Sequence, residues 1–257
     1  MPAPNIVLGS GTLFFDLQNA SGILTGERLL AQTPGFTINV ASEKLVYEDT
    51  DTKVAENLFT VTTKVARTAK IDCRDMSPEN YALFVIGASA TLSQSSGAVL
   101  NEVYTAVIQD RFYQLGASVS NPTGVRNITA VVVTGPTATP LYVINTDYTV
   151  DLALGRLFIV PGGAITNGSN LEVDYTRSTA TRNQVVTNTI GENYGALRFV
   201  SNNSIGVNRD MYAPKVLLTP SGDLAMKSRT DYQQATFDVS FERKDLYAQL
   251  YIDGRAV

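Results

Sequence analysis

The chain has no histidine, no tryptophan and a single cysteine among its 257 residues. Without histidine it lacks Ser-His-Asp and Cys-His nucleophiles, imidazole metal ligands and the commonest general base. Its one cysteine, Cys73, can form neither an intrachain disulfide nor a cysteine-rich zinc site. These absences predict a protein that is not an enzyme and has no catalytic, metal or cofactor residues.

Long apolar runs and positive charge are also scarce. No stretch approaches the roughly 18 apolar residues of a membrane span. The opening residues 1–5, Met-Pro-Ala-Pro-Asn, lack the basic and apolar regions of a secretory signal. The formal net charge is −4, so the surface has no surplus of positive charge to hold a phosphate backbone. We expect no membrane partner and no specific binding of DNA.

The pattern that dominates the chain is alternation of apolar and polar residues, which predicts strands. One face of a long strand would carry Phe59, Val61, Val65, Ala69, Ile71 and Cys73. A partner strand over residues 36–47 changes phase at Ala41-Ser42, which indicates a bulge. The sequence therefore predicts a long, half-buried β-hairpin with the Cys73 thiol inward and unreactive.

Residues 48–57 connect these two strands. Their charged residues are Glu48, Asp49, Asp51, Lys53 and Glu56. Ten residues are too many for a tight hairpin turn and too polar to be buried alone. The segment is either a solvated loop or an exposed arm that makes contacts.

A short helix follows. Ser77-Pro78-Glu79 supplies an N-cap, a proline at the first helical position and an acid in the first turn. Gly87 is expected to end this helix, and its apolar face would lie on a sheet. Residues 88–98, rich in Ser, Ala and Thr, are expected to form an exposed loop.

The rest of the chain is predicted to be strands. Residues 126–175 give short strands separated by Gly and Asn, which is typical of a β meander or sandwich. Further strands are expected over residues 196–200, 215–219, 236–242 and 250–252. We expect one domain over 1–257, in which residues 120–180 form an inserted or outward-facing β elaboration.

Several stretches occur in an informative order. They are residues 11–15, the hairpin end at 70–72, the short helix, the pair 147–151 and 174–176, and residues 194–199 and 213–222. This order resembles siphophage major tail tube proteins. The resemblance implies an all-β fold with minor α content: a tail-tube-type β-sandwich or barrel with a long hairpin and one short packing helix, shared with the type VI secretion tube protein.

The resemblance also implies a function. In that family, hexameric rings stack head to tail into a conduit for DNA ejection, and a hairpin loop touches the next ring. The resemblance assigns the inter-ring contact to Glu48, Asp49, Asp51, Lys53 and Glu56. The partners would be further copies, other tail proteins at the tube ends and passing DNA. The site of action would be the virion tail, after assembly in the host cytoplasm.

Three points stay open. The acidic loop calls for a basic patch on the neighbouring ring, and Arg182, Arg198, Arg209 and Lys215 are the candidates. Lys64 and Lys70 suit a wall facing DNA only if acids offset them. Another virion structural protein, such as a decoration or tail-terminator subunit, or a carbohydrate-binding β-sandwich fits the same strands. The lack of tryptophan counts against glycan binding, and the 12 tyrosines are scattered.

Overall fold

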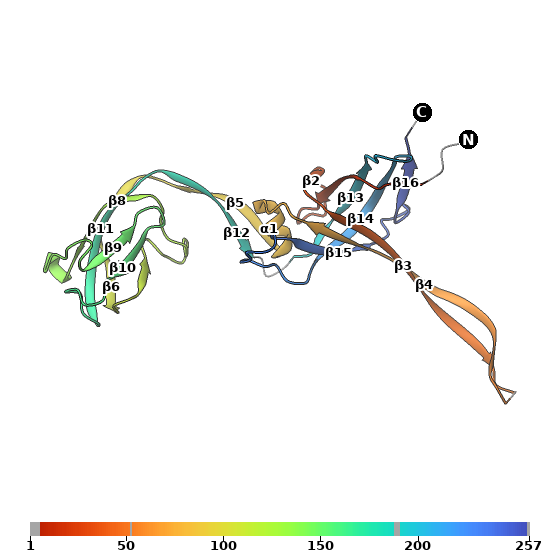
Figure 1. Ribbon diagram of the computed structural model, residues 1–257, viewed down its shortest axis with the longest axis horizontal. Coiled ribbons are helices and arrows are strands. Elements are labelled where there is room, and N and C mark those ends of the chain that lie inside the picture. The colour runs from red at the N-terminus through yellow and green to blue at the C-terminus, as the bar shows by residue number, and fades with distance from the viewer. Residues whose placement is uncertain (1–5, 52, 188–190, 256–257) are drawn as a thin grey trace. The chain divides into compact units, whose positions relative to one another are not determined.

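A computed structural model of the protein describes residues 6–51, 53–187 and 191–255. The structure is mostly β, with 55% strand and 4% helix, which confirms the predicted all-β fold class. The chain divides into two compact units (Figure 1): unit 1 is Met1–Ser89 with Val185–Val257, and unit 2 is Ala90–Gln184. We expect a single domain over 1–257 with an elaboration over 120–180, and residues 120–180 lie inside unit 2.

Unit 1 is built on one antiparallel sheet. Its strands are β1 (Gly11–Leu17), β2 (Arg28–Leu30), β3 (Gly35–Asp49), β4 (Glu56–Cys73), β13 (Asn193–Ser201), β14 (Arg209–Ser221), β15 (Ala235–Phe241) and β16 (Tyr251–Gly254). The order across the sheet is β2-β1-β13-β14-β15-β4-β3, and β16 pairs with β14 beside this path. Among the described residues no sheet closes into a barrel, so one chain alone does not form the barrel that the resemblance implies.

The core of unit 1 lies on the face of this sheet that α1 (Pro78–Phe84) covers. Its largest fully buried side chains are Leu13, Phe15, Leu30, Ile71, Leu197 and Phe237. Ser77 Oγ caps α1 by accepting the Asn80 N–H at 3.4 Å, and Phe84 meets Phe237 edge-on with ring centroids 6.1 Å apart. The predicted helix start and its packing role are thus confirmed.

The long hairpin of β3 and β4 is confirmed, but its burial is not as expected. The two strands pair from Gly35↔Asp72 to Asp49↔Glu56, with register shifts at Glu43/Lys44 and at Tyr47/Glu48, whereas the bulge expected at Ala41-Ser42 is absent. In β4 the buried side chains are those of Ala69, Ile71 and Cys73, at the C-terminal end of the strand. Phe59, Val61 and Val65, expected on the buried face, are exposed. The bulge at Glu43/Lys44 interrupts the alternation, so Phe59 and Val61 do not share a face with Ile71, and no described residue of unit 1 covers the ribbon where they lie.

Unit 2 is a small sandwich. One sheet has the order β6-β11-β8 (Gly97–Val107, Ser169–Arg177, Ile128–Thr134), and the other has β7-β10-β9 (Phe112–Gln114, Arg156–Ile159, Tyr148–Asp151). Both sheets contribute to a single core that includes Val107, Ile128, Val133, Leu157, Ile159, Leu171 and Val173. A turn precedes β8: the Gly124 N–H donates to the Asn121 carbonyl at 3.0 Å, and Gly124 has a φ of +65° that favours glycine.

Residues 88–98 are not the loop that the sequence predicted. Gly87–Gln94 forms β5, which pairs with β12 (Ala180–Thr187), and the chain passes between the units along these two strands. No residue of β5 is buried. The Ser, Ala and Thr residues give no apolar period because neither face of this ribbon packs on a core, so the pattern is that of a loop.

Each unit has its own core, so damage to one should stay local. We predict that Leu171→Ala, which leaves a cavity at a side chain with no exposed area, lowers the stability of unit 2 by about 2–5 kcal/mol. Hydrogen exchange should accelerate within residues 90–184 and stay slow in the core strands of unit 1. Equal acceleration in both units would show that they unfold as one.

A second prediction concerns the C-terminal strand of unit 1. Asp210 accepts the Ser201 N–H at 2.8 Å and an Arg255 Nη2–H at 3.1 Å, and the arginine lowers the pKa of this carboxyl to about 2. An unfolded aspartate has a pKa of about 3.9, so this stabilisation is complete above that pH and is lost as the pH falls towards 2. The stability difference between wild type and Asp210→Asn should therefore shrink over that window in urea titrations. A pH-independent difference would contradict it.

Candidate interaction site

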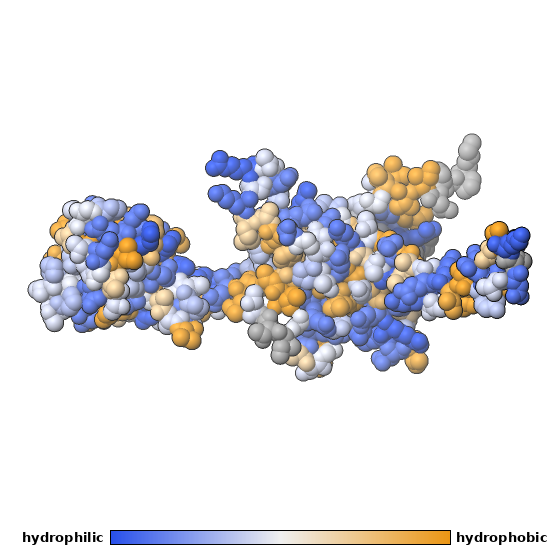
Figure 2. All heavy atoms as spheres, turned by 90° about the horizontal axis from the view of Figure 1, so that it is seen from below, coloured by the Kyte–Doolittle hydropathy of each residue, from blue (hydrophilic) through white to orange (hydrophobic). Residues whose placement is uncertain are grey.

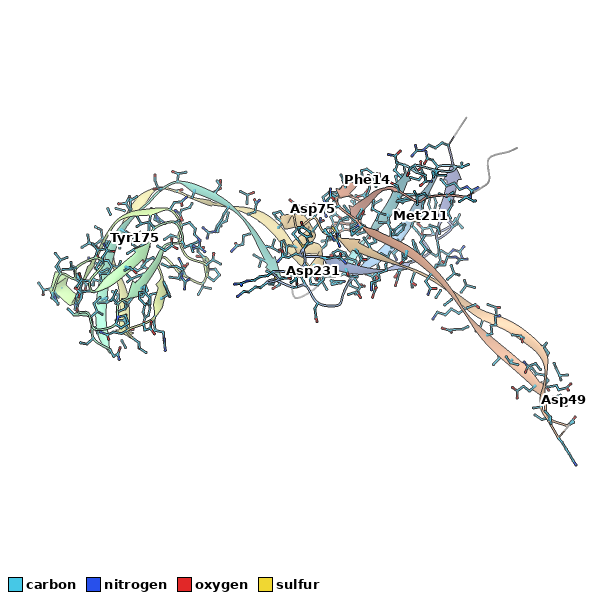
Figure 3. The ribbon with its side chains drawn as sticks, in the orientation of Figure 1. Phe14, Asp49, Asp75, Tyr175, Met211 and Asp231 are labelled. Carbon is cyan, nitrogen blue, oxygen red and sulfur yellow. The ribbon has the colours of Figure 1, made fainter. Side chains whose placement is uncertain are left out.

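The charged residues of the hairpin lie together at its tip. Glu48 and Asp49 end β3, Glu56 begins β4, and Asp51 and Lys53 lie in the turn between them. The turn is shorter than the sequence suggested, because Glu48 pairs with Asn57 and Asp49 with Glu56. Asp49 is half-buried, its carboxylate accepts the Asp51 N–H at 2.9 Å, and the other four side chains are exposed (Figure 3). The structure thus presents four acids and one lysine at one end.

Behind the tip, the hairpin is a two-stranded ribbon with exposed apolar side chains (Figure 2). The exposed ones include Val40, Leu45, Tyr47, Leu58, Phe59 and Val61. Tyr47 and Phe59 are register partners with stacked rings 5.2 Å apart, although Phe59 is 57% exposed. Sequence reasoning placed Phe59 and Val61 in the interior. Their exposure could have been predicted, because this part of the strand follows a turn with five charged residues.

Two lysines of this hairpin, Lys64 and Lys70, have acidic neighbours. Lys64 Nζ lies 3.1 Å from the Glu43 carboxylate, across the ribbon. Lys70 is in register opposite Asp238 of β15. The Lys64–Glu43 pair is well exposed, so it contributes about 0–1 kcal/mol to stability. Its main effect is to cancel charge along the ribbon.

Most of the basic residues considered as partners for the tip are already engaged. Those residues are Arg182, Arg198, Arg209 and Lys215. Arg182 lies in unit 2, where it donates to the Gly124 carbonyl at 2.9 Å. Arg198 and Lys215 form ion pairs with Glu27 and Glu242, each at 2.7 Å. Arg209, at the start of β14, is exposed.

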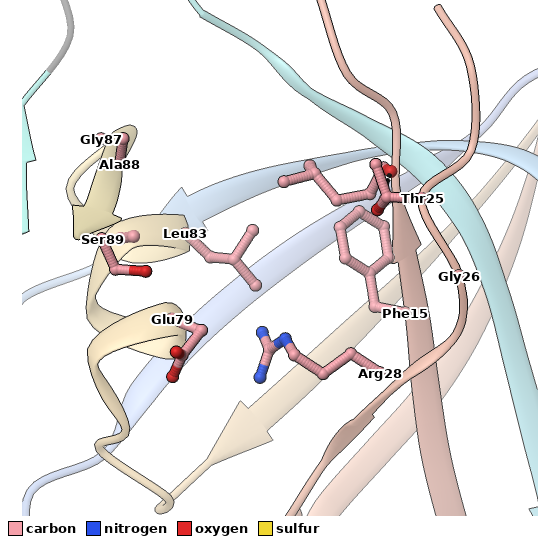
Figure 4. Close-up of a pocket in the computed structure, with 11 residues that line it drawn as sticks. Phe15, Thr25, Gly26, Arg28, Glu79, Leu83, Gly87, Ala88 and Ser89 are labelled. Carbon is pink, nitrogen blue, oxygen red and sulfur yellow. Dashed lines mark hydrogen bonds between the residues drawn. The ribbon is translucent and has the colours of Figure 1, made fainter. Parts of the chain in front are cut away.

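A hollow of about 420 Å³ lies in unit 1 between β1 and α1 (Figure 4). Its walls are mainly apolar, from Phe15 and Leu83, and the Arg28 guanidinium points across it towards Glu79. Burial lowers the pKa of Arg28, while the negative charge of Glu79 opposes that shift. Among the described residues lining the hollow, these two are the ionisable ones.

Cys73 lies at the end of β4 with no exposed area. Its Sγ is 3.5 Å from the Ala31 carbonyl oxygen, and Asn80 Nδ2 donates to it at 3.5 Å. Burial raises the pKa of the thiol, which keeps it protonated and weakly nucleophilic at neutral pH. The predicted inward orientation is confirmed.

We predict that Cys73→Ser folds and assembles as the wild type does, since a hydroxyl can occupy the same hydrogen-bonding positions. The cost should be about 1–2 kcal/mol, measured by thermal unfolding. The larger Cys73→Leu should be the more harmful change, because the site has no spare volume. Fast reaction of the wild-type thiol with an aromatic disulfide reagent would contradict the assignment of a buried, inert group.

Neither helical segment in the described part of the chain has the length and hydrophobicity that a membrane crossing needs.

Comparisons with known proteins identify a family. No curated protein matches the sequence. A family model described as "Protein of unknown function UCP028589" matches residues 6–241, which is most of the chain. The chain therefore belongs to the family UCP028589.

Proposed function

We propose that this protein is a non-catalytic structural subunit of a bacteriophage tail tube, whose copies form stacked hexameric rings around a conduit for DNA ejection. The observation that carries the proposal is the uncovered β3–β4 ribbon. A two-stranded ribbon is marginally stable in water on its own. This one carries exposed aromatic and aliphatic side chains and an acidic tip, so contact with further copies would stabilise it.

The edges of the unit 1 sheet support ring formation. Among the described residues, β3 pairs only with β4, so one side of its 15-residue backbone has no strand partner. β2 is the opposite edge of the same sheet. Open edges favour pairing with another chain. A contact that joins different surfaces of identical copies closes a ring or extends a filament. The number six comes from the resemblance to tail tube proteins.

The charges are compatible with a conduit. Each copy carries a formal net charge of −4, and Lys64 and Lys70 have acidic neighbours. A wall without clustered cations would let a polyanion slide, because phosphate binding depends on lysine and arginine. DNA would pass without specific contacts, and other tail proteins would bind the tube ends in the virion.

A second candidate, a carbohydrate-binding sandwich, is favoured by one feature of unit 2. Phe112 is exposed, its ring lies 4.7 Å from that of Phe158, and the Arg156 guanidinium is 4.4 Å from its centroid. Exposed rings of this kind can stack on sugars. Glycan-array binding that Phe112→Ala abolishes would support this candidate, whereas tubes in micrographs would support the first.

The tail-tube proposal is tested by shortening the tip. Because Asp49 and Glu56 are register partners, an Asn-Gly turn can replace residues 50–55 and close the hairpin. We predict that this variant folds, shown by an unchanged far-UV circular dichroism spectrum, yet forms no tubes in negative-stain micrographs.

Val119→Ser, at a fully exposed apolar residue of unit 2, is the matched surface control and should form tubes as the wild type does. Tubes of normal length from the shortened variant would show that stacking does not depend on the tip. A wild-type chain that stays monomeric at high concentration would refute the proposal itself.

A further inference from the structure

We infer that the loop of residues 222–234, between β14 and β15, is the surface that receives the hairpin tip of a second copy. This inference rests on the proposed head-to-tail stacking and names the acceptor that the stacking requires. The loop was not among the basic sites considered from the sequence.

The first argument is position within unit 1. β15 begins at Ala235, which is the register partner of Cys73 at the end of β4. The hairpin tip lies at the opposite end of β4, where Asp49 pairs with Glu56. Asp231 and Asp49, labelled in Figure 3, mark the two ends. A head-to-tail contact joins different surfaces of neighbouring copies, and two opposite ends meet that requirement.

The second argument is charge. The middle of the loop carries Lys227 and Arg229, both exposed. Asp223 and Asp231 flank these two cations, so the formal charge of the whole loop is zero. In the part of the chain that the structure describes, no carboxylate lies within ion-pair distance of either cation. The tip offers the complement, four acids against one lysine. Complementary rims of this kind steer association and set register.

The third argument is apolar complementarity. Met226 and Tyr232, on either side of the two cations, are 71% and 85% exposed. On the hairpin, Tyr47 and Phe59 lie just behind the acidic tip and are also exposed. Methionine adapts its shape and makes favourable contacts with aromatic rings. In the loop, two exposed cations lie between the apolar residues Met226 and Tyr232. In the hairpin, the acidic tip lies between Tyr47 and Phe59, so opposite charges and apolar side chains can meet in one contact.

The loop is held in shape at its base. Tyr81 of α1 donates its hydroxyl to Gln233 Oε1 at 2.6 Å, and Arg74 Nε donates to Gln234 Oε1 at 3.1 Å. Near the middle, Ser228 Oγ accepts the Asp231 N–H at 3.0 Å. A surface that is ordered before contact loses less conformational entropy on binding.

Three other cations of unit 1, the exposed Arg209 and Arg243 and the half-buried Lys244, are worse placed. β14 runs from Arg209 to Ser221, and Ser221 is in register with Thr236 beside the loop, so Arg209 lies at the hairpin's own end of the sheet. Arg243 and Lys244 follow Phe241, the last residue of β15, on that same side. Arg243 Nε also donates to the Asp245 carbonyl at 3.0 Å. A tip that projects away from this end would not meet them in a head-to-tail stack.

The test is a charge reversal in the full chain. Lys227→Glu with Arg229→Glu should raise the critical concentration for tube formation about tenfold or more, because each contact then opposes like charges. Arg243→Glu with Lys244→Glu makes the same charge change at the other end and should leave it unchanged. Adding Asp51→Lys and Glu56→Lys to the loop variant should restore assembly. Pelleting assays and micrographs measure each result.

Cross-linking identifies the contact directly. A carbodiimide applied to wild-type tubes should join Lys227 to a tip carboxylate of another copy, found by mass spectrometry. If the shortened tip blocks tubes but the loop reversal has no effect, or if the tip carboxylates link elsewhere, the inference fails and the proposed function stands. If the wild-type chain forms no tubes, both fail.

Discussion

The length of β15 is the constraint on which the rest of unit 1 depends. Its ladder with β4 runs from Cys73 to Thr68 and then stops. From Arg67 to Glu56, β3 is the one strand that pairs with β4 among the described residues, so the hairpin leaves the sheet as a ribbon. A longer β15 would have made an ordinary wide sheet. Its early end instead places unpaired backbone and uncovered side chains where another copy can reach them.

Each of the two units is stabilised by a core of its own. Unit 1 buries a core of its own between its sheet and α1, and this core anchors the base of the hairpin at Ala69, Ile71 and Cys73. Unit 2 has a second core within its two small sheets. Each unit can therefore tolerate exposed apolar residues on its surface, because neither depends on those residues for its interior.

Local signals in the sequence were sufficient for much of the fold. The Ser77 cap and the long hairpin follow from short-range chemistry, and the five tip residues follow from their place between two strands. Burial of Phe59 was predicted wrongly, since alternation does not say whether a second layer exists. The strand β5 was missed because a ribbon exposed on both faces has no apolar period. The position of Lys227 opposite the tip depends on the long-range register of Ala235 with Cys73, which no local pattern encodes.

The continuity of β4 has a mechanical consequence. This single strand of 18 residues runs from Cys73, beside the Arg74 that holds the loop of residues 222–234, to Glu56 at the tip. A force that draws the loop of residues 222–234 and the hairpin tip apart would act along the axis of β4. The backbone hydrogen bonds of the ladders with β3 and β15 lie across that axis, so they would be loaded in shear and together rather than unzipped one by one. A chain of such subunits would resist stretching through covalent backbone and parallel hydrogen bonds, while the ribbon could still bend across its thin direction.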